Sequence, residues 1–206
     1  MAESAGDRRL TLADIEDLRE YERGRAIYRD MIIELKRRRR VPVGPLVTLL
    51  FENRQTIRFQ VQEMARIERM ATDDQIQGEL DIYNPLIPPP GELSATLFVE
   101  LTSDEALRQW LTKLVGIERS VELRIGGDGG STQAVIRSVP EGAHAEALTR
   151  AEVTSSVHYV RLPVGEGLVE RFAAGPVTLA VAHPEYQEET VLSDETREEL
   201  LKDLEP

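Results

Sequence analysis

The sequence contains no cysteine. This absence excludes disulfide bonds, a thiolate nucleophile, Cys-ligated zinc and Cys-held iron–sulfur clusters. No apolar run approaches the roughly 20 residues that a membrane-spanning helix needs. The first ten residues, MAESAGDRRL, also lack the apolar centre of a signal peptide. We therefore expect a cytoplasmic protein that does not enter a membrane.

Basic residues are in the minority, with 25 Lys and Arg against 37 Asp and Glu and a formal net charge of -12. Because neutralising phosphates requires a basic surface, this excess argues against general nucleic-acid binding. It also disfavours an anionic membrane surface. The sequence has no Gly-x-Ser-x-Gly elbow, His-Glu-x-x-His pair or dinucleotide fingerprint. We expect a non-enzymatic protein without a cofactor.

The length of 206 residues, with 41% hydrophobic and 30% charged residues, is typical of one globular domain. We expect residues 1–9 to be a disordered tail and residues 10–206 to form a single domain. Within it, residues 10–88 are rich in helical patterns and residues 92–206 in strand patterns. The proline-rich segment NPLIPPP connects the two parts as a rigid linker.

Apolar spacing and capping residues predict helices in the N-terminal part. Thr11 caps the first, and a second carries Ile27 to Leu35 and ends in KRRRR at 36–40, where cations complement the helix dipole. Asn53 caps a third helix that runs from Arg54 to about Met70. Thr72 or Asp73 caps a short fourth helix. Between the second and third helices, residues 46–52 form a strand with two mostly apolar faces.

The C-terminal part alternates between strand and helix patterns. Strands are expected at 92–101, 121–125, 132–139, 156–164 and 177–183, and helices at 102–115, 165–174 and 193–204, the first of them capped by Thr102. The glycine run GGDGG at 126–130 is expected to be a hairpin turn. This order predicts an α+β fold with a mixed, mostly antiparallel sheet containing ferredoxin-like (split βαβ) elements. Helices cover that sheet, and a helical segment precedes it.

Two histidines face the apolar side of predicted strands. His158 is in phase with Val160 and Leu162, and His183 is in phase with Leu179 and Val181. They are weak candidates for a metal or acid–base site. If residues 165–174 form a crossover helix, the two strands are parallel and the histidines lie near opposite ends of the sheet. Antiparallel pairing would bring them together.

Histidine also occurs in two further contexts, at His144 and in the segment HPEY. His144 lies in a polar segment and is expected to be exposed. The segment HPEY at 183–186 follows a strand, where both turns and functional loops occur.

The segment LLFENRQTIRFQVQEMARIERM at 49–70 is the densest group of polar side chains. Its candidate ligand-binding residues are Glu52, Asn53, Arg54, Arg58, Gln62, Glu63 and Arg66. Arg58, Gln62 and Arg66 are four residues apart and share one helix face. Guanidinium groups on that face can bind a carboxylate or phosphate, with Glu52 or Glu63 as a base. The same face can instead pair with Asp and Glu of a neighbouring helix, and both alternatives stay open.

The sequence also resembles a known family. The segments LKRRRRVPVGPLVTLLFENRQTIRFQVQEMARIER, ELDIYNPLIP, LVGIE, VHYVRL and HPEY resemble the bacterial domain of unknown function 3501 family, from about Leu10 to Leu204. FENRQTIRFQVQEM and YNPLIP are the most specific parts. We add Tyr83 and Asn84 of the latter to the candidate ligand-binding residues. The resemblance implies no activity, so no catalytic residue can be assigned from it. Family genes are often neighbours of genes for rubrerythrin-like and iron–sulfur proteins, which implies an accessory role in redox or peroxide metabolism.

The functional hypothesis is therefore a non-enzymatic accessory protein that forms a homodimer and binds a protein partner of a redox system. The Arg/Gln helix face and the KRRRR end would supply polar contacts. One alternative is a binding protein or enzyme for a small anionic ligand, with Arg54, Arg58 and Arg66 as the anion clamp. The other is a metalloprotein that uses His158, His183 and nearby carboxylates.

Overall fold

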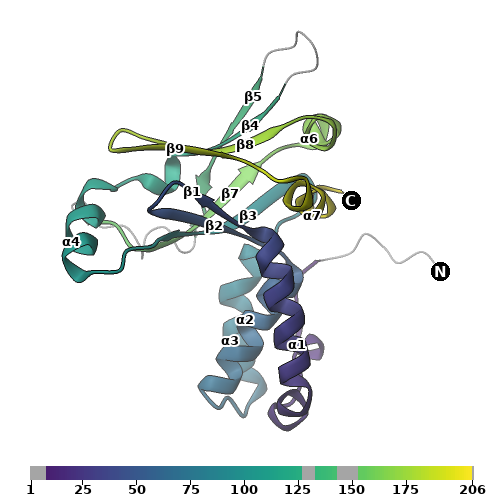
Figure 1. The fold of residues 1–206 in the computed structure, drawn as a ribbon. Coiled ribbons are helices and arrows are strands. Elements are labelled where there is room, and N and C mark those ends of the chain that lie inside the picture. The colour runs from purple at the N-terminus through teal and green to yellow at the C-terminus, as the bar shows by residue number, and fades with distance from the viewer. Residues whose placement is uncertain (1–7, 127–132, 143–152, 206) are drawn as a thin grey trace.

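The computed structural model describes residues 8–126, 133–142 and 153–205. Three helices form an arm beside two stacked sheets (Figure 1). The arm consists of α1 (Leu18–Arg39), α2 (Arg54–Ile67) and α3 (Asp73–Tyr83). Among the described residues, three further helices lie around the sheets, namely α4 (Asp104–Lys113), α6 (Val169–Ala174) and α7 (Asp194–Leu204). Short 3-10 turns occur at Leu12–Asp14, Asn84–Leu86, Ile117–Arg119 and Glu166–Leu168.

Each sheet in the described residues is antiparallel throughout. The first has the order β1 (Arg40–Val43), β2 (Val47–Glu52), β3 (Glu92–Val99), β7 (Val157–Pro163) and β6 (Val139–Pro140). The second has the order β5 (Ala134–Arg137), β4 (Val121–Ile125), β8 (Val177–His183) and β9 (Tyr186–Val191). The α+β class and the mostly antiparallel pairing are confirmed.

The strands on either side of α6 require a correction. β7 pairs with β3, with Tyr159 opposite Thr96, whereas β8 pairs with β4, with Leu179 opposite Leu123. The segment 165–174 therefore connects two sheets and is not a crossover within one sheet. The parallel pair that a crossover helix would have produced does not form, and the two strands do not pair antiparallel with each other either, because each pairs with an antiparallel neighbour in a different sheet. His158 and His183 consequently belong to different sheets.

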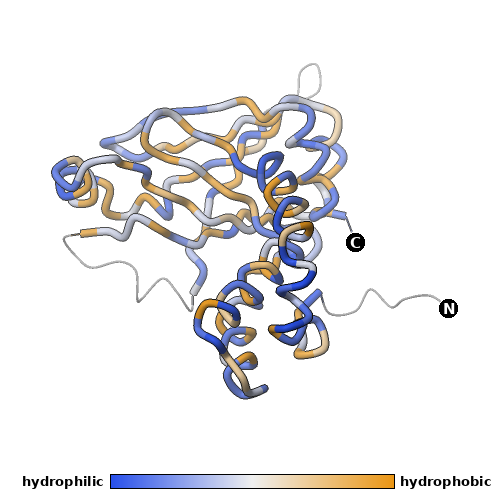
Figure 2. The backbone as a smooth tube through the Cα atoms, turned by 60° about the horizontal axis from the view of Figure 1, so that its bottom comes forward, coloured by the Kyte–Doolittle hydropathy of each residue, from blue (hydrophilic) through white to orange (hydrophobic). Residues whose placement is uncertain are grey.

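The main core lies between the two sheets. Side chains of alternate residues from both inner faces are buried in it, among them Leu49, Phe51, Leu97, Leu123, Val160 and Leu179. Figure 2 shows hydrophobic stretches along the strands of the sheets and further ones in the helices of the arm. β1 and β2 come from the helix-rich part of the chain but contribute to this core together with strands of the sheet-rich part. The two parts therefore share one apolar interior.

The two sheets are joined at both edges. On one side the chain passes from β5 in one sheet to β6 in the other across Ser138. On the other side the Tyr186 hydroxyl donates to the carbonyl of Val43 (2.6 Å) and accepts from the Leu46 N–H (3.1 Å). Thr190 of β9 also donates to the Pro42 carbonyl of β1 (2.7 Å). These contacts cover backbone groups that edge strands otherwise leave unpaired.

The arm has its own smaller core. Ile57 and Val61 of α2 pack with Leu80 of α3 and with Leu10 near the start of the described chain. Asn84 fixes this start, because its amide accepts from the Leu10 N–H (2.7 Å) and donates to the Leu10 carbonyl (2.9 Å). Since no helix in the arm is apolar all round, tertiary packing of one face stabilises each of them.

Most predicted helix starts are confirmed. The side chains of Asn53, Thr72 and Ser193 cap α2, α3 and α7. The predicted cap of α4 was wrong by one residue. Ser103, one residue after the expected Thr102, caps α4 by accepting from the Ala106 N–H (3.2 Å).

The N-terminal helices also differ from the prediction. Thr11 begins only a 3-10 turn, and α1 is one continuous helix that starts after Asp17, whose carboxylate accepts from the Arg19 N–H (2.9 Å).

Two edge strands were missing from the prediction. β1 contains Pro42 and directly follows α1, so its sequence resembled a helix end followed by breakers. β9 carries mostly exposed polar residues, as edge strands often do. HPEY is the turn between β8 and β9, with His183 opposite Tyr186.

Some expectations concern residues outside the described ranges. These are the GGDGG turn beyond Gly126, His144 and most of the N-terminal tail. Arg8 is described, and it donates to the Asp203 carbonyl (2.8 Å). Within the described ranges, no helix combines the length and apolar composition needed to cross a membrane.

Candidate functional site

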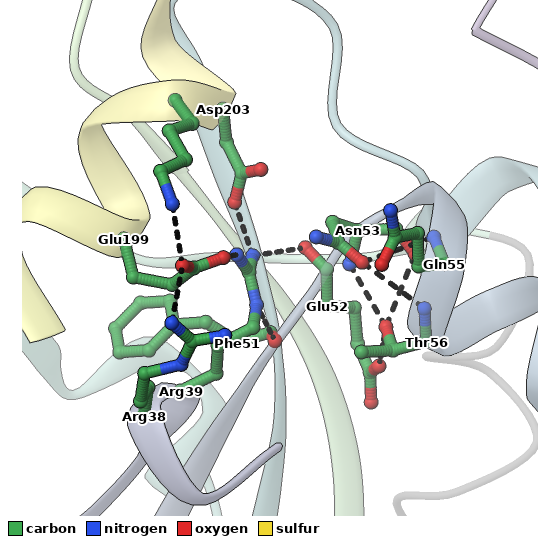
Figure 3. A network of polar contacts seen from close by, with 10 residues as sticks. Arg38, Arg39, Phe51, Glu52, Asn53, Gln55, Thr56, Glu199 and Asp203 are labelled. Atoms are coloured by element: carbon green, nitrogen blue, oxygen red, sulfur yellow. Dashed lines mark hydrogen bonds and ion pairs between the residues drawn. The ribbon is translucent and has the colours of Figure 1, made fainter. Parts of the chain in front are cut away.

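The candidate site lies where α1 ends, β2 ends and α2 begins, beside α7 (Figures 1 and 3). Arg39 is at its centre and is 0% exposed. Its Nε donates to the Phe51 carbonyl (2.9 Å) and one Nη donates to the Glu52 carbonyl (3.1 Å). The guanidinium also pairs with Glu199 (3.3 Å) and with Asp203 on α7. Arg39 therefore joins the last residues of β2 to α7.

The two carboxylates that share Arg39 differ in protonation behaviour. Burial raises the pKa of Asp203, and the charge of Arg39 offsets only part of this effect. Burial also opposes ionisation of Glu199, but the hydrogen bond from Lys202 (2.8 Å) and the charge of Arg39 outweigh it and lower the pKa. The directions differ because burial dominates at Asp203, where the nearby charge of Glu199 raises the pKa further, whereas Lys202, Arg39 and Arg38 together lower the pKa of Glu199.

The side chain of Glu52 turns away from Arg39 and is buried between β3 and α2. Its two oxygens accept from the hydroxyls of Thr56 (2.5 Å) and Thr96 (2.6 Å). The Thr56 hydroxyl in turn accepts from the Asn53 N–H (2.9 Å). Both carboxylate oxygens are thus held by hydroxyl groups at the joint between sheet and helix, which satisfies a buried charge by hydrogen bonding.

Asn53 is occupied by capping. Its Oδ1 accepts from the N–H groups of Gln55 and Thr56, both at 3.0 Å. This contact satisfies two of the amides that the first turn of a helix leaves unpaired. The positive end of the α2 dipole still points toward the site.

The Arg/Gln face of α2 meets the chain segment that precedes α1. Arg54 pairs with the Asp14 carboxylate (2.6 Å). Arg58 donates to the Asp14 carbonyl (2.6 Å) and pairs with Glu16 (2.9 Å). The Gln62 amide accepts from the Glu16 N–H (2.9 Å) and donates to the Glu16 carbonyl (3.0 Å). These contacts favour the pairing alternative for much of this face.

Glu63 is the centre of a second polar cluster, between α1 and α2. It accepts two hydrogen bonds from Arg25 (both 2.8 Å) and one from Tyr21 (2.7 Å), and it pairs with Arg66 (3.1 Å). Hydrogen bonding from Arg25 and Tyr21 lowers the pKa of Glu63 to about 2. Burial and the contact with Glu63 raise the pKa of Tyr21. Glu63 and Arg66 therefore stabilise the contact between α1 and α2. The hydrogen bonds of Asn84 with Leu10 stabilise the contact between the end of α3 and the start of the described chain.

Arg54 and Arg58 also line a cavity of about 630 Å³ between α1 and α2. Its polar wall includes Arg38 and Gln55, and its apolar wall includes Met31, Ile32 and Leu35. A smaller hollow of about 310 Å³ shares Arg54 and Gln55 with it. The first turn of α2 thus stands beside two hollows, and the larger one falls in the size range of small-molecule sites, roughly 300–1,000 Å³.

Two residues that line this cavity each contain a buried polar atom for which no hydrogen-bond partner occurs in the described part of the chain. These atoms are the Tyr28 hydroxyl oxygen and the Arg38 Nε. Arg38 approaches Glu199 only at 3.8 Å, through a different nitrogen. The Arg58 guanidinium lies over the Tyr28 ring, 5.3 Å from its centre. Burial raises the pKa of Tyr28, and the adjacent, positively charged guanidinium of Arg58 offsets part of this effect. Tyr28 and Arg38 are ten residues apart on α1, so their two buried atoms do not share one ligand position.

His158 and His183 each form hydrogen bonds with residues close to their own strand ends. His183 Nδ1 accepts from the Glu185 N–H (3.2 Å), so its Nε2 donates to the Val115 carbonyl (3.1 Å). His158 Nε2 lies 2.8 Å from the Thr154 hydroxyl and 3.0 Å from the Ser155 carbonyl. Burial lowers the pKa of His158. Over residues 8–126, 133–142 and 153–205, no three His, Cys, Asp or Glu side chains form a group that could hold a metal.

Several site residues were not recognised from the sequence. Arg38 and Arg39 belong to KRRRR, which resembled a solvated helix end, and Tyr28 had no distinguishing pattern. Glu199 and Asp203 lie about 160 residues away in the chain, at separations of 160 and 164 from Arg39. A separation of four between two acids on one helix face was the available signal, but it did not identify their partner.

Comparisons with known proteins place the chain in a family. No curated protein matches it. A crystal structure of a protein of unknown function from Burkholderia pseudomallei is 34% identical, covers 95% of this chain and 99% of its own chain, and superposes with a TM-score of 0.85. The match described as "Protein of unknown function (DUF3501)" extends over residues 9–204 and confirms the resemblance. The chain therefore belongs to the DUF3501 family.

Proposed function

We propose that this protein is a non-enzymatic binding protein that holds a small anion in the cavity between α1 and α2. The observation that carries this proposal is the convergence of Arg38, Arg54 and Arg58 on one cavity in a chain with a net charge of -12. Guanidinium groups provide paired donors that match carboxylate and phosphate oxygens.

The position at the start of α2 adds to the attraction for an anion. The helix dipole places partial positive charge there, and the Gln55 side chain supplies a neutral polar group. The arginines already have carboxylate neighbours, since Arg54 contacts Asp14 and Arg58 contacts Glu16. Neither of these acids lines the cavity. A guanidinium has five N–H donors, so a bound anion can share it with an internal carboxylate.

Binding is favoured over catalysis by the positions of the expected bases. Glu52 is held by two threonine hydroxyls, and Glu63 is held by Arg25 and Tyr21. Neither lines the cavity. Glu34 does line it, but it pairs with Arg37 (2.9 Å), which lowers its pKa and keeps it ionised. A group fixed in this way is poorly suited to accept a proton near neutral pH.

Isothermal titration with inorganic phosphate, sulfate and a series of carboxylates tests this proposal. We expect at least one anion to bind, and Arg54→Gln and Arg58→Gln to weaken its binding by about tenfold each, the loss of one charge-assisted hydrogen bond. Arg29→Gln is the control, because Arg29 is an exposed arginine of α1 that does not line the cavity. If no anion binds, or if the control variant weakens binding equally, the proposal is wrong.

A second candidate function is docking of a protein partner on the arm. Large apolar side chains are exposed there on all three helices, namely Ile27, Met31, Ile33, Ile67 and Ile82. Such exposure is typical of interaction surfaces when the side chains gather. The KRRRR end and the Arg/Gln face contribute less than expected, because their cations contact acids, carbonyls or aromatic rings of the same chain.

The partner to look for is a second copy of the chain or, following the family resemblance, a cytoplasmic rubrerythrin-like or iron–sulfur protein. Light scattering tests the homodimer, and affinity purification from the native host tests the redox partner. Ile67→Ser and Ile82→Ser should reduce recovery of either partner. If both variants recover the partner as well as the parent protein does, the apolar side chains of the arm are not the docking surface.

A further inference from the structure

The α1–α2 cavity has one basic end and one apolar wall that continues along α1. Arg38 and Arg54 line it at the end of α1 and the start of α2, and Arg58, one turn further along α2, lies over the Tyr28 ring. Met31 lines the cavity and is 64% exposed, and Ile27, one turn earlier, is 73% exposed. Ile27, Met31 and Arg38 are spaced at i, i+4 and i+11, so they lie on one stripe of the helix.

We infer that the ligand of this site is an amphipathic monocarboxylate, whose head binds the arginines and whose hydrocarbon tail lies along α1 over Met31 and Ile27. This inference rests on the proposed function and specifies the chemical class of its ligand. The guanidinium groups of Arg38 and Arg54, which line the cavity, supply paired donors, and a carboxylate supplies two acceptor oxygens without a donor of its own.

The charge of the cavity selects a monoanion over a polyanion. Arg38, Arg54 and Arg58 each have an acidic neighbour, respectively Glu199 (3.8 Å), Asp14 (2.6 Å) and Glu16 (2.9 Å). Glu34 adds another negative charge to the lining. The excess positive charge at the head position is therefore small. A phosphate dianion would meet more repulsion from the surrounding acids than a single carboxylate would.

The distance along α1 sets the length of the tail. At 1.5 Å per residue, Met31 lies about 10 Å and Ile27 about 16 Å from Arg38 along the helix axis. An extended chain advances roughly 1.2 Å per bond, so about eight carbons reach Met31 and about thirteen reach Ile27. The apolar wall provides a reason for the exposed positions of these two side chains, since a bound tail removes their surface from water.

Titration calorimetry on the full chain with acetate, butyrate, octanoate, tetradecanoate, octanol and inorganic phosphate tests the inference. We expect affinity to rise by about threefold to fourfold per buried methylene between butyrate and octanoate. The double variant Ile27→Ser, Met31→Ser should lose about tenfold or more in affinity for tetradecanoate, which is long enough to reach Ile27, and keep its affinity for acetate or butyrate. Ile33→Ser is the control, because Ile33 is exposed on α1 but does not line the cavity. Thermal unfolding confirms that the variants remain folded.

The outcomes separate the inference from the proposed function. If phosphate or acetate binds through the arginines and chain length has no effect, the inference is overturned and the proposed function stands. If octanol binds as tightly as octanoate, the head is not recognised and the inference is overturned. If no probe binds, both are overturned. If light scattering shows that the double variant changes the oligomeric state, a second copy covers the apolar stripe, and the tail is not its occupant.

Discussion

Individual charged side chains hold distant parts of this chain together. Arg39 is fully buried and contacts the end of β2 and two acids of α7, while Glu63 collects donors from α1 and α2. Buried ion pairs add little stability relative to apolar residues of the same shape, but removing one partner leaves the other charge buried and unpaired. We therefore expect single substitutions at these residues to cause the largest losses in the free energy of unfolding.

Arg39→Met should lower the free energy of unfolding by about 3–5 kcal/mol, the typical cost of breaking a buried pair. The substitution leaves Glu199 with only its more exposed partners and removes the donors to two strand-end carbonyls. Urea unfolding measures the loss. Arg37→Met is the control, since Arg37 is 57% exposed and its surface pairs should contribute about 1 kcal/mol or less. A loss below 1 kcal/mol for Arg39→Met would contradict this account.

Glu63→Gln should lower stability by about 2 kcal/mol at neutral pH, the scale of charge-assisted hydrogen bonds. Because the folded pKa of Glu63 is lowered to about 2, its contribution is complete above the unfolded pKa near 4.5 and disappears as the pH falls from there toward 2. The stability difference between the parent and the variant should therefore narrow over this range. Urea unfolding of both proteins from pH 7 to pH 3 measures this change. A difference in unfolding free energy that stays constant with pH would contradict the prediction.

At the scale of elements, the tight turn between β1 and β2 determines how closely β9 can approach the edge of the first sheet. Gly44 lies between β1 and β2 with φ +67. A Cβ there would come within 2.5 Å of the Tyr186 hydroxyl and of the Glu188 Cγ. Glycine is required both by the backbone conformation and by the close approach of β9.

Gly44→Ala should destabilise the protein by about 2 kcal/mol, since a strained positive φ alone costs roughly 1–3 kcal/mol. Gly24→Ala is the matched control. Gly24 is inside α1, where an added Cβ meets nothing within 4 Å, so alanine should stabilise by about 0.5–1 kcal/mol. Thermal unfolding of both variants measures the two opposite shifts. Shifts of the same sign would show that the turn does not need glycine.

On the scale of the whole molecule, the two sheets close against each other through Tyr186. Its hydroxyl contacts both Val43 and Leu46 on the β1–β2 hairpin, and burial raises its pKa. Its ring also packs edge-on against Trp110, 6.4 Å between centres. One side chain thus joins β9, the first hairpin and α4.

Tyr186→Phe should therefore lower stability by about 2 kcal/mol, because two buried backbone groups lose their partner. Hydrogen exchange should increase most at Leu46, whose amide donates to the hydroxyl. Tyr83→Phe is the control, since no hydrogen bond of the Tyr83 hydroxyl occurs among the described contacts, and it should change stability by less than 0.5 kcal/mol. Equal effects of the two substitutions would exclude the sheet-closing role of Tyr186.

The local features of this protein are determined by the sequence alone. Asn53, Thr72 and Ser193 start helices where a side-chain oxygen can cap the first amides, and alternation of apolar residues produces most strands of both sheets. The absence of cysteine limits its chemistry at any level of structure. These signals are readable because they act between residues a few positions apart.

Only the tertiary structure decided which strands pair and which charges are buried. β7 and β8 follow each other along the chain but join different sheets, because strand pairing depends on partners far away in the sequence. KRRRR contains both a fully buried Arg39 and a 57% exposed Arg37, and nothing in a run of identical charges distinguishes them. The packing of α7 against the end of α1 makes that distinction, and it also places Arg38 beside the cavity where we expect the ligand to bind.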